Sequence, residues 1–451
     1  MMKNAFLETR RQTRNKQTRS KELCQIVNQS KGKKYLLVQI NNFIKKKDFD
    51  FFNLVKYWFI SANDISVIPF NFVFRTQLIP IIQTHLLDYN SLPSSEILVS
   101  ILRIISVLTA PEAPTNNFFS SPDVLSTFAE LLTKNDENIT KFTLLILSQL
   151  CIKFPELIQF IHQINLPSQL LSLYLLSPNE DISGISSFFL CQIACYSSIE
   201  RSAEIIIALL NFVQNGNIKA ATMLFKGIVF HFPLSPQFSD VIIQCNFCGF
   251  ISQFLPKLNQ NHLEIISLIF NSLSLVVTNE DGLSSFITSN LIALISQLDL
   301  IQPSINCDVF NDLTQLLCNL IVNENGDIDS QIINAQIIEK MCVCSNLCEY
   351  DSKIKTFGFL SFIIQKKNKI MCQIIAENNG IVPFFELFDT FSDEMVALSL
   401  QTLIIFINIL PEAKILFDQF DFDLFIQTVD QFEIPELSEQ AQVLLSLVTS
   451  C

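Results

Sequence analysis

Apolar helical segments that close on a short polar position recur along the chain at a nearly constant spacing. Seven positions align in this way: Ser106, Gln149, Gln192, Gly227, Ser274, Asn319 and Ile363. Subtracting neighbouring residue numbers gives steps of 43, 43, 35, 47, 45 and 44 residues. A period of this length is typical of a helical solenoid, in which each unit of short helices buries its apolar face by stacking on the next. The pattern predicts an all-α superhelix with one long concave surface.

Composition favours the same architecture. The chain has 451 residues, 49% hydrophobic and 16% charged. A globule of that size would split into domains, whereas a solenoid grows in one dimension. The 9 glycines are too few for repeated β-turns or phosphate-binding loops. Because H-E-x-x-H, G-x-S-x-G, Walker and dinucleotide motifs are also missing from the sequence, we expect no enzyme activity and no cofactor.

The cysteines and the longest apolar runs have simple interpretations. There are 13 cysteines, an odd number, and 4 scattered histidines. The isolated C-x-x-C pair of Cys245 and Cys248 is a weak zinc signal, so we expect free thiols packed in the core of a protein in a reducing compartment, and no metal. No run reaches the roughly 18 to 20 apolar residues that a membrane span needs, and we expect no membrane association.

Charge divides the chain into a basic arm and an acidic remainder. Residues 1–47 hold 13 of the 30 Lys and Arg and two acids, which gives +11, and the rest of the chain carries −24. The densest bases are Arg10, Arg11, Arg14, Lys16, Arg19 and Lys21. We expect an arm that is disordered alone and folds on an acidic partner. A solvated tail, a nuclear-targeting patch and a nucleic-acid arm are the alternatives; nucleic acid is disfavoured because an acidic body repels phosphate.

Several segments resemble the repeats of importin-alpha, the armadillo adaptor of nuclear import. LTQLLCNLIVNENGDIDSQIINAQIIEKM (313–341) follows the family pattern, with Asn319 on the family's asparagine. Residues 270–298, 101–132 and 144–175 follow it as well. The resemblance implies an armadillo α-solenoid, a right-handed superhelix of short helices.

The two ends of the chain extend the resemblance. The basic arm, 1–47, is similar to the segment of the family that binds importin-beta. Residues 48–451 would then form about nine to ten armadillo repeats. The acidic tail, 423–448, is similar to the family's last repeat, which meets an export receptor. The implied partners are an importin-beta-type carrier, cargo peptides and that export receptor.

The resemblance also assigns positions to a cargo groove. In the family, tryptophans form slots for lysine and arginine stems, and an asparagine four residues on binds the peptide backbone. The tryptophan positions hold Leu102, Leu145, Phe188, Met223, Phe270 and Gln315, and the asparagine positions hold Ser106, Gln149, Gln192, Gly227, Ser274 and Asn319. Lys153 stands where the family has an aspartate that clamps a signal lysine. We therefore expect any basic peptide to bind near Asn319. Glu280, Asp281, Glu324 and Asp327 are expected in the loops beside the groove there.

Two functions are compatible with these features. The first is a divergent import adaptor, present in cytoplasm and nucleus, that holds a nuclear-localisation segment in the groove. The second is a protein-interaction scaffold with no role in transport, whose leucine, phenylalanine and methionine positions favour apolar contacts. In a variant of the first, lysines of residues 31–34 or 45–47 fold back into the groove and inhibit it.

Overall fold

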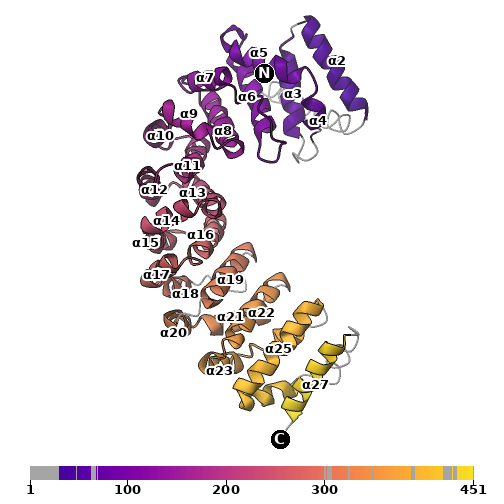
Figure 1. Cartoon of the computed structure of the whole chain (residues 1–451), viewed down its shortest axis with the longest axis vertical. Coiled ribbons are helices and arrows are strands. Elements are labelled where there is room, and N and C mark those ends of the chain that lie inside the picture. The colour runs from indigo at the N-terminus through magenta and orange to yellow at the C-terminus, as the bar shows by residue number, and fades with distance from the viewer. Residues whose placement is uncertain are drawn as a thin grey trace, which may run out of the picture. The chain divides into compact units, whose positions relative to one another are not determined.

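The computed structural model describes residues 30–46, 48–61, 70–298, 307–322, 326–347, 350–386, 392–419 and 434–449, and residues 68, 301 and 429. Throughout these ranges the regular secondary structure is helical, and the all-α prediction is confirmed. Figure 1 labels the helices along the chain. The chain divides into two compact units. Unit 1 comprises Met1–Leu209 and Ile218–Leu224, and unit 2 comprises Leu210–Asn217 and Phe225–Cys451.

Unit 1 is a series of short helices in which a longer helix closes each repeat. Its elements are α2 (Ser30–Lys46), α3 (Asp50–Ser61), α4 (Phe70–Val73), α5 (Leu78–Leu87), η2 (Tyr89–Ser91), α6 (Ser95–Thr109), α7 (Pro122–Leu131), α8 (Glu137–Lys153), α9 (Leu157–Gln163), α10 (Leu166–Gln169), η3 (Leu170–Tyr174) and α11 (Glu180–Cys195). The closing helices α3, α6, α8 and α11 pack one on the next. We call the closing helix of a repeat its third helix.

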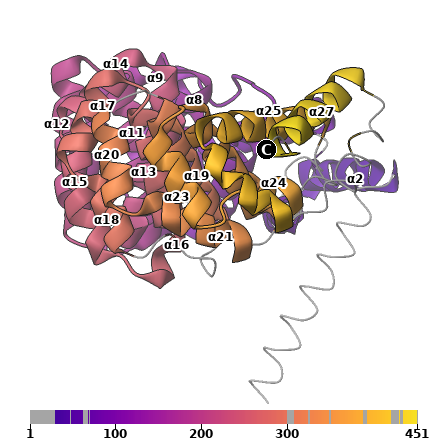
Figure 2. The ribbon, with the colours of Figure 1, turned by 90° about the horizontal axis from the view of Figure 1, so that it is seen from below.

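Unit 2 repeats a three-helix pattern more regularly. Its elements are α14 (Pro236–Gln244), α15 (Phe247–Phe254), η5 (Leu255–Lys257), η6 (Gln260–His262), α16 (Leu263–Val276), α17 (Glu280–Thr288), α18 (Leu291–Gln297), α19 (Cys307–Val322), α20 (Gly326–Asn334), α21 (Ile337–Leu347), α22 (Tyr350–Gln365), α23 (Lys369–Glu377), α24 (Pro383–Glu386), α25 (Asp393–Ile409), η8 (Pro411–Gln419) and α27 (Pro435–Thr449). Figure 2 shows α14, α17 and α20 following one another in one layer and α15 and α18 in another. The third helices α16, α19, α22 and α25 form the remaining layer.

Left-handed residues make the sharp corner between the first and second helices of a repeat. Asn165, Asn246, Asn290, Gln336 and Asn379 all have φ between 52° and 57°. Asparagine tolerates this conformation better than most residues with a side chain. Four of these five corner residues are asparagines, and Gly380 directly follows one of them, Asn379.

The short third step of the sequence repeat, 35 residues from Gln192 to Gly227, has a structural cause. Helix α12 (Ile199–Gln214) runs for 16 residues without a corner, and α13 (Ile218–His231) and η4 (Phe232–Leu234) follow it. No residue of α12 has a positive φ. A single helix therefore occupies the place of the first and second helices, and the repeat loses the residues of the corner. Both α12 and α13 contribute residues to each unit.

Helix α2 lies within the predicted basic arm. Its Leu36, Ile40 and Phe43 are buried, and the ring of Phe43 stacks on that of Phe51 with centroids 5.0 Å apart. Residues 30–46 are therefore helical and packed against α3. A helix cannot lie in a groove as an extended linker, so this geometry opposes the fold-back of residues 31–34 and 45–46. The six densest basic residues of the arm lie outside the described residues.

Most of the described cysteines lie in the core, as expected. Cys151, Cys191, Cys195, Cys248, Cys342, Cys344 and Cys372 are buried. Over the described ranges, no group of three His, Cys, Asp or Glu is placed to hold a metal ion. No single described helix is long and apolar enough to cross a membrane; the pair Pro236–Gln244 and Phe247–Lys257, bent by 56°, reaches that length and composition only jointly.

Candidate functional site

The third helices of unit 1 present one stripe of incompletely buried side chains. We call this stripe the H3 face of unit 1. It consists of Val99, Arg103, Val107, Phe142, Leu145, Gln149, Ile185 and Phe188. On each helix these residues recur at three or four positions, which places them on one side, and the residues between them are buried against the rest of the repeat. Most of the stripe is apolar.

Amide side chains at the predicted asparagine positions link neighbouring third helices. The hydroxyl of Thr109 on α6 donates to Gln149 Oε1 on α8 at 2.9 Å. The hydroxyl of Ser148 on α8 donates to Gln192 Oε1 on α11 at 3.1 Å. In the family pattern these amides bind a peptide backbone; here they hold consecutive repeats together. Ser106 is nearly buried and donates to the carbonyl of Arg103 at 2.8 Å.

The predicted slot positions divide between surface and core. Leu102 on α6 and Phe270 on α16 are fully buried. A buried side chain cannot form the wall of an exposed slot, so these two stabilise the repeat stack. Leu145 and Phe188 are half-buried and remain on the H3 face, and Gln315 on α19 is exposed.

Three predicted groove residues, Ser274, Gln315 and Asn319, lie together in unit 2. Asn319 Nδ2 on α19 donates to the hydroxyl of Ser274 on α16 at 2.7 Å and to its carbonyl at 3.2 Å. Gln315 Nε2 donates to Asn319 Oδ1 at 3.0 Å. The asparagine that matches the family pattern thus joins two helices of the stack, as the glutamines of unit 1 do.

The acids expected to flank Asn319 occupy helix starts. Glu280 and Asp281 lie in the first turn of α17, where Asn279 is the N-cap, and Asp327 lies in the first turn of α20. Carboxylates there complement the helix dipole. The sequence placed these three residues in loops, which is wrong by one turn of helix. Glu324 lies outside the described residues.

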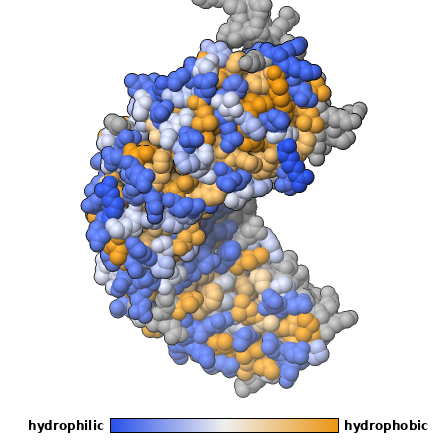
Figure 3. Space-filling model, turned by 45° about the horizontal axis from the view of Figure 1, so that its top comes forward, coloured by the Kyte–Doolittle hydropathy of each residue, from blue (hydrophilic) through white to orange (hydrophobic). Residues whose placement is uncertain are grey.

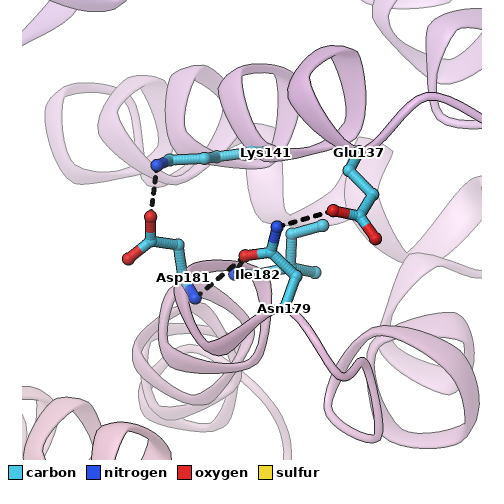
Figure 4. A network of polar contacts seen from close by, with 5 residues as sticks. All are labelled: Glu137, Lys141, Asn179, Asp181 and Ile182. Atoms are coloured by element: carbon cyan, nitrogen blue, oxygen red, sulfur yellow. Dashed lines mark hydrogen bonds and ion pairs between the residues drawn. The ribbon is translucent and has the colours of Figure 1, made fainter.

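A polar cluster joins the starts of α8 and α11 at the edge of the H3 face (Figure 4). Asn179 caps α11 by accepting from the backbone of Asp181, and its Nδ2 donates to Glu137 on α8 at 2.8 Å. Lys141 on α8 forms an ion pair with Asp181. The hydrogen bond that Lys141 donates to Asp181 lowers the pKa of this carboxyl below its usual range. The positive charges of Lys141 and Lys219 lower it further. The cluster fixes how the two third helices meet.

Cations lie on or beside the H3 face of unit 1. The guanidinium of Arg103 stands 4.9 Å from the ring centroid of Phe142, a cation–π distance. Lys153, at the end of α8, donates to the carbonyl of Ala113 at 2.8 Å, and burial lowers the pKa of this ammonium. Lys153 was recognised from sequence as a positive charge at the position of the family's aspartate. The pair of Arg103 and Phe142 was missed; its signal is that Arg103 lies four residues after Val99 and Phe142 three residues before Leu145, on the same helix faces.

A cavity of about 640 Å³ opens beside this polar cluster, between the turn before α8 and the turn before α11. Its carboxylates are already engaged, since Asp136 accepts from two backbone amides of α8 and Glu137 accepts from Asn179. The hydroxyl of Tyr174 donates to the carbonyl of Leu132 at 2.9 Å. The lining therefore offers a ligand few uncommitted polar groups.

Comparison with known proteins gives structural neighbours only. No protein-family model matches the sequence, and no curated protein matches it. An engineered protein solved by a structural genomics consortium aligns over 96% of this chain and 99% of its own, with 12% identity and a TM-score of 0.61. A structure from work on a phosphorylation switch that controls the interaction between cadherin and beta-catenin covers 81% of this chain and 68% of its own, with 13% identity and a TM-score of 0.52.

A third neighbour is a designed armadillo repeat protein in complex with the peptide (KR)4. It covers 62% of this chain and 99% of its own, with 14% identity and a TM-score of 0.37. At these identities, structural likeness concerns the fold. The three-helix repeats and the neighbours confirm the predicted class: the chain is an all-α armadillo-repeat solenoid.

Proposed function

We propose that the chain is a protein-interaction scaffold that binds a segment of a partner along the H3 face of unit 1. The observation that carries the proposal is the apolar character of this stripe, where Leu145 and Phe188 keep exposed surface while the amides beside them are committed to the repeat stack. Apolar side chains that stay partly exposed on successive helices provide the contact area that a docked segment buries.

A peptide selection tests the scaffold function. Random peptides displayed on phage are selected on the full chain, and the affinities of the enriched peptides are measured for the double variant Leu145→Ala/Phe188→Ala. We expect a loss of about tenfold or more, because truncating two central apolar contacts removes at least 1.4 kcal/mol of binding. The control is Leu176→Ala/Ile207→Ala, which truncates two exposed residues (63% and 48%) outside the third helices.

The outcomes of the selection separate the possibilities. Thermal unfolding verifies that both double variants are folded. Equal binding by wild type and Leu145→Ala/Phe188→Ala would refute the H3 face as the binding surface. A loss confined to the control variant would move the surface to the other side of unit 1.

Nuclear import is a second candidate function, favoured by the +11 charge of residues 1–47. In this proposal the arm recruits an importin-beta-type carrier, the repeats hold a cargo segment, the last repeat meets an export receptor, and the protein acts in cytoplasm and nucleus. Basic-peptide binding is expected to be weak, because Lys153 has the wrong sign for it and Leu102 and Phe270 form no slots.

Neutralising the arm tests import directly. The change of Arg10, Arg11, Arg14 and Arg19 to Ala should abolish salt-sensitive capture of an importin-beta-type carrier in a pull-down, since four of the arm's cations are removed. A truncation of the arm, tested beside this variant, should remove residues 1–29 only. Residues 30–46 form α2, which packs against α3. Undiminished capture by the four-alanine variant would defeat the import proposal and leave the scaffold proposal intact.

A further inference from the structure

Two cations at the third helices of unit 1, Arg103 and Lys219, form no ion pair with a described carboxylate. Asp181 on α11 forms an ion pair with Lys141 and also lies within the electrostatic reach of Lys219 on α13. No ion pair joins a described carboxylate to Arg103, whose buried Nε has no hydrogen-bond partner in the described ranges. Two cations without an ion pair among the described residues therefore lie at this face, on a chain whose net charge is −13.

Lys219 is held beside the H3 face by a close helix approach. A Cβ built on Gly184 of α11 would lie 3.1 Å from Lys219 Cγ and 3.2 Å from Met223 Cγ. The stems of these two residues thus cross α11 where it has no side chain, and Lys219 is exposed. The guanidinium of Arg103 is fixed at the opposite end of the stripe by the ring of Phe142. The two cations bracket Leu145 and Phe188.

We infer that the H3 face of unit 1 selects an acidic, apolar segment of a partner protein, with carboxylates placed for Arg103 and Lys219 and apolar side chains for the stripe between them. The inference rests on the proposed scaffold function and names its partner class. Arginine suits a carboxylate because its planar fork can donate two parallel hydrogen bonds. The apolar surface between the cations distinguishes a protein partner from a nucleic acid, whose backbone offers phosphate without apolar contacts.

Helix spacing sets the length of the segment. Packed helices lie about 8–10 Å apart, so the three steps from α6 through α8 and α11 to α13 span about 25–30 Å. An extended chain advances about 3.3 Å per residue, and it covers this span in about eight residues. Side chains at even offsets point to the same face of the segment. Two acids eight residues apart, with apolar residues at the even positions between them, match the stripe.

Synthetic peptides of that design test the inference on the full chain. The probe is a labelled twelve-residue peptide with Glu at its second and tenth positions, Leu at the fourth, sixth and eighth, and Ser elsewhere; its partners carry Gln or Lys in place of Glu. Fluorescence anisotropy should give about tenfold tighter binding of the Glu peptide than of the Gln peptide, with the Lys peptide weaker still, and the difference should shrink in high salt.

Charge-matched variants locate the selectivity. Arg103→Gln/Lys219→Gln should lower the affinity for the Glu peptide about tenfold and leave the Gln peptide unchanged. Lys134→Gln/Lys369→Gln removes the same charge from two other surface positions, one over the ring of Tyr89 and one in a 3.8 Å ion pair with Glu412, and should leave both affinities unchanged. Lys141 stays in place because its removal would leave Asp181 without its ion pair.

Each adverse outcome has its own meaning. Absence of measurable binding by the Glu peptide, equal binding of the Glu and Gln peptides, or tighter binding of the Lys peptide overturns the inference. A single-stranded DNA twelve-mer that binds as tightly as the Glu peptide, with the same dependence on Arg103 and Lys219, overturns it in favour of a general polyanion site. If the Glu and Gln peptides bind wild type equally and Leu145→Ala/Phe188→Ala binds neither, the acidic preference is refuted and the scaffold function stands.

Discussion

The change of Phe270 to Ala should lower the free energy of unfolding of unit 2 by about 3–5 kcal/mol. Phe270 has no exposed surface, and its helix α16 packs against α19. Removing a buried phenylalanine loses the transfer free energy of the ring and leaves a cavity that the surrounding helices fill only in part. Urea denaturation at neutral pH, followed by circular dichroism, measures the loss.

Phe362 provides the matched control for this change. It belongs to the same unit, lies on α22 and is 42% exposed. Phe362→Ala should change the free energy of unfolding by no more than about 0.5–1 kcal/mol, as expected for a partly exposed position. Comparable losses for Phe270→Ala and Phe362→Ala would mean that Phe270 is not a core residue, and would restore it as a candidate slot in a binding groove.

Unit 2 should lose stability as the pH falls from about 6.5 to 4, through His231. This residue ends α13, is 1% exposed and contacts the rings of Phe230 and Phe238. Burial lowers the pKa of its imidazole from 6.5 to about 4. Between those values the unfolded chain binds a proton that the folded unit does not, so unfolding becomes easier with acid. The contribution is about 2 kcal/mol at pH 5 and on the order of 3 kcal/mol at pH 4.

A pH series on one variant isolates this effect. His231→Phe keeps an aromatic ring and removes the titrating group. The difference in unfolding free energy between variant and wild type should be constant above pH 7 and should move in favour of the variant by about 2 kcal/mol at pH 5. Urea titrations at a few pH values between 4 and 8 measure it. Parallel curves for the two proteins would show that His231 does not titrate as a buried neutral group.

The repeat period was predictable from sequence because stacking forces the same apolar spacing on every repeat. The corners were harder to recognise. A left-handed residue can be glycine or asparagine, and Asn246 and Asn290 carry no mark in the sequence beyond the apolar residue that follows each of them. The merged helix α12 was visible only as the 35-residue step, since nothing in its composition says that a corner is missing.

The candidate site was predicted less completely than the fold. Alignment to a family pattern puts Leu102 and Leu145 at equivalent positions, yet one is fully buried and the other half-buried. A rotation of the helix by a fraction of a turn decides between these states, and the sequence pattern does not resolve it. The bonds from Thr109 to Gln149 and from Ser148 to Gln192 depend on neighbouring repeats about 40 residues away, which a single repeat cannot reveal.

A photo-crosslink from the H3 face tests most directly whether a partner segment binds there. A benzoylphenylalanine replaces Phe188 in one protein and Ile207, on α12, in a second, and each is irradiated with the tightest peptide from the phage selection. Binding along the H3 face predicts a crosslinked product from position 188 and none from position 207. A crosslink from position 207 with none from position 188 would contradict it, because the partner would then lie away from the third helices of unit 1.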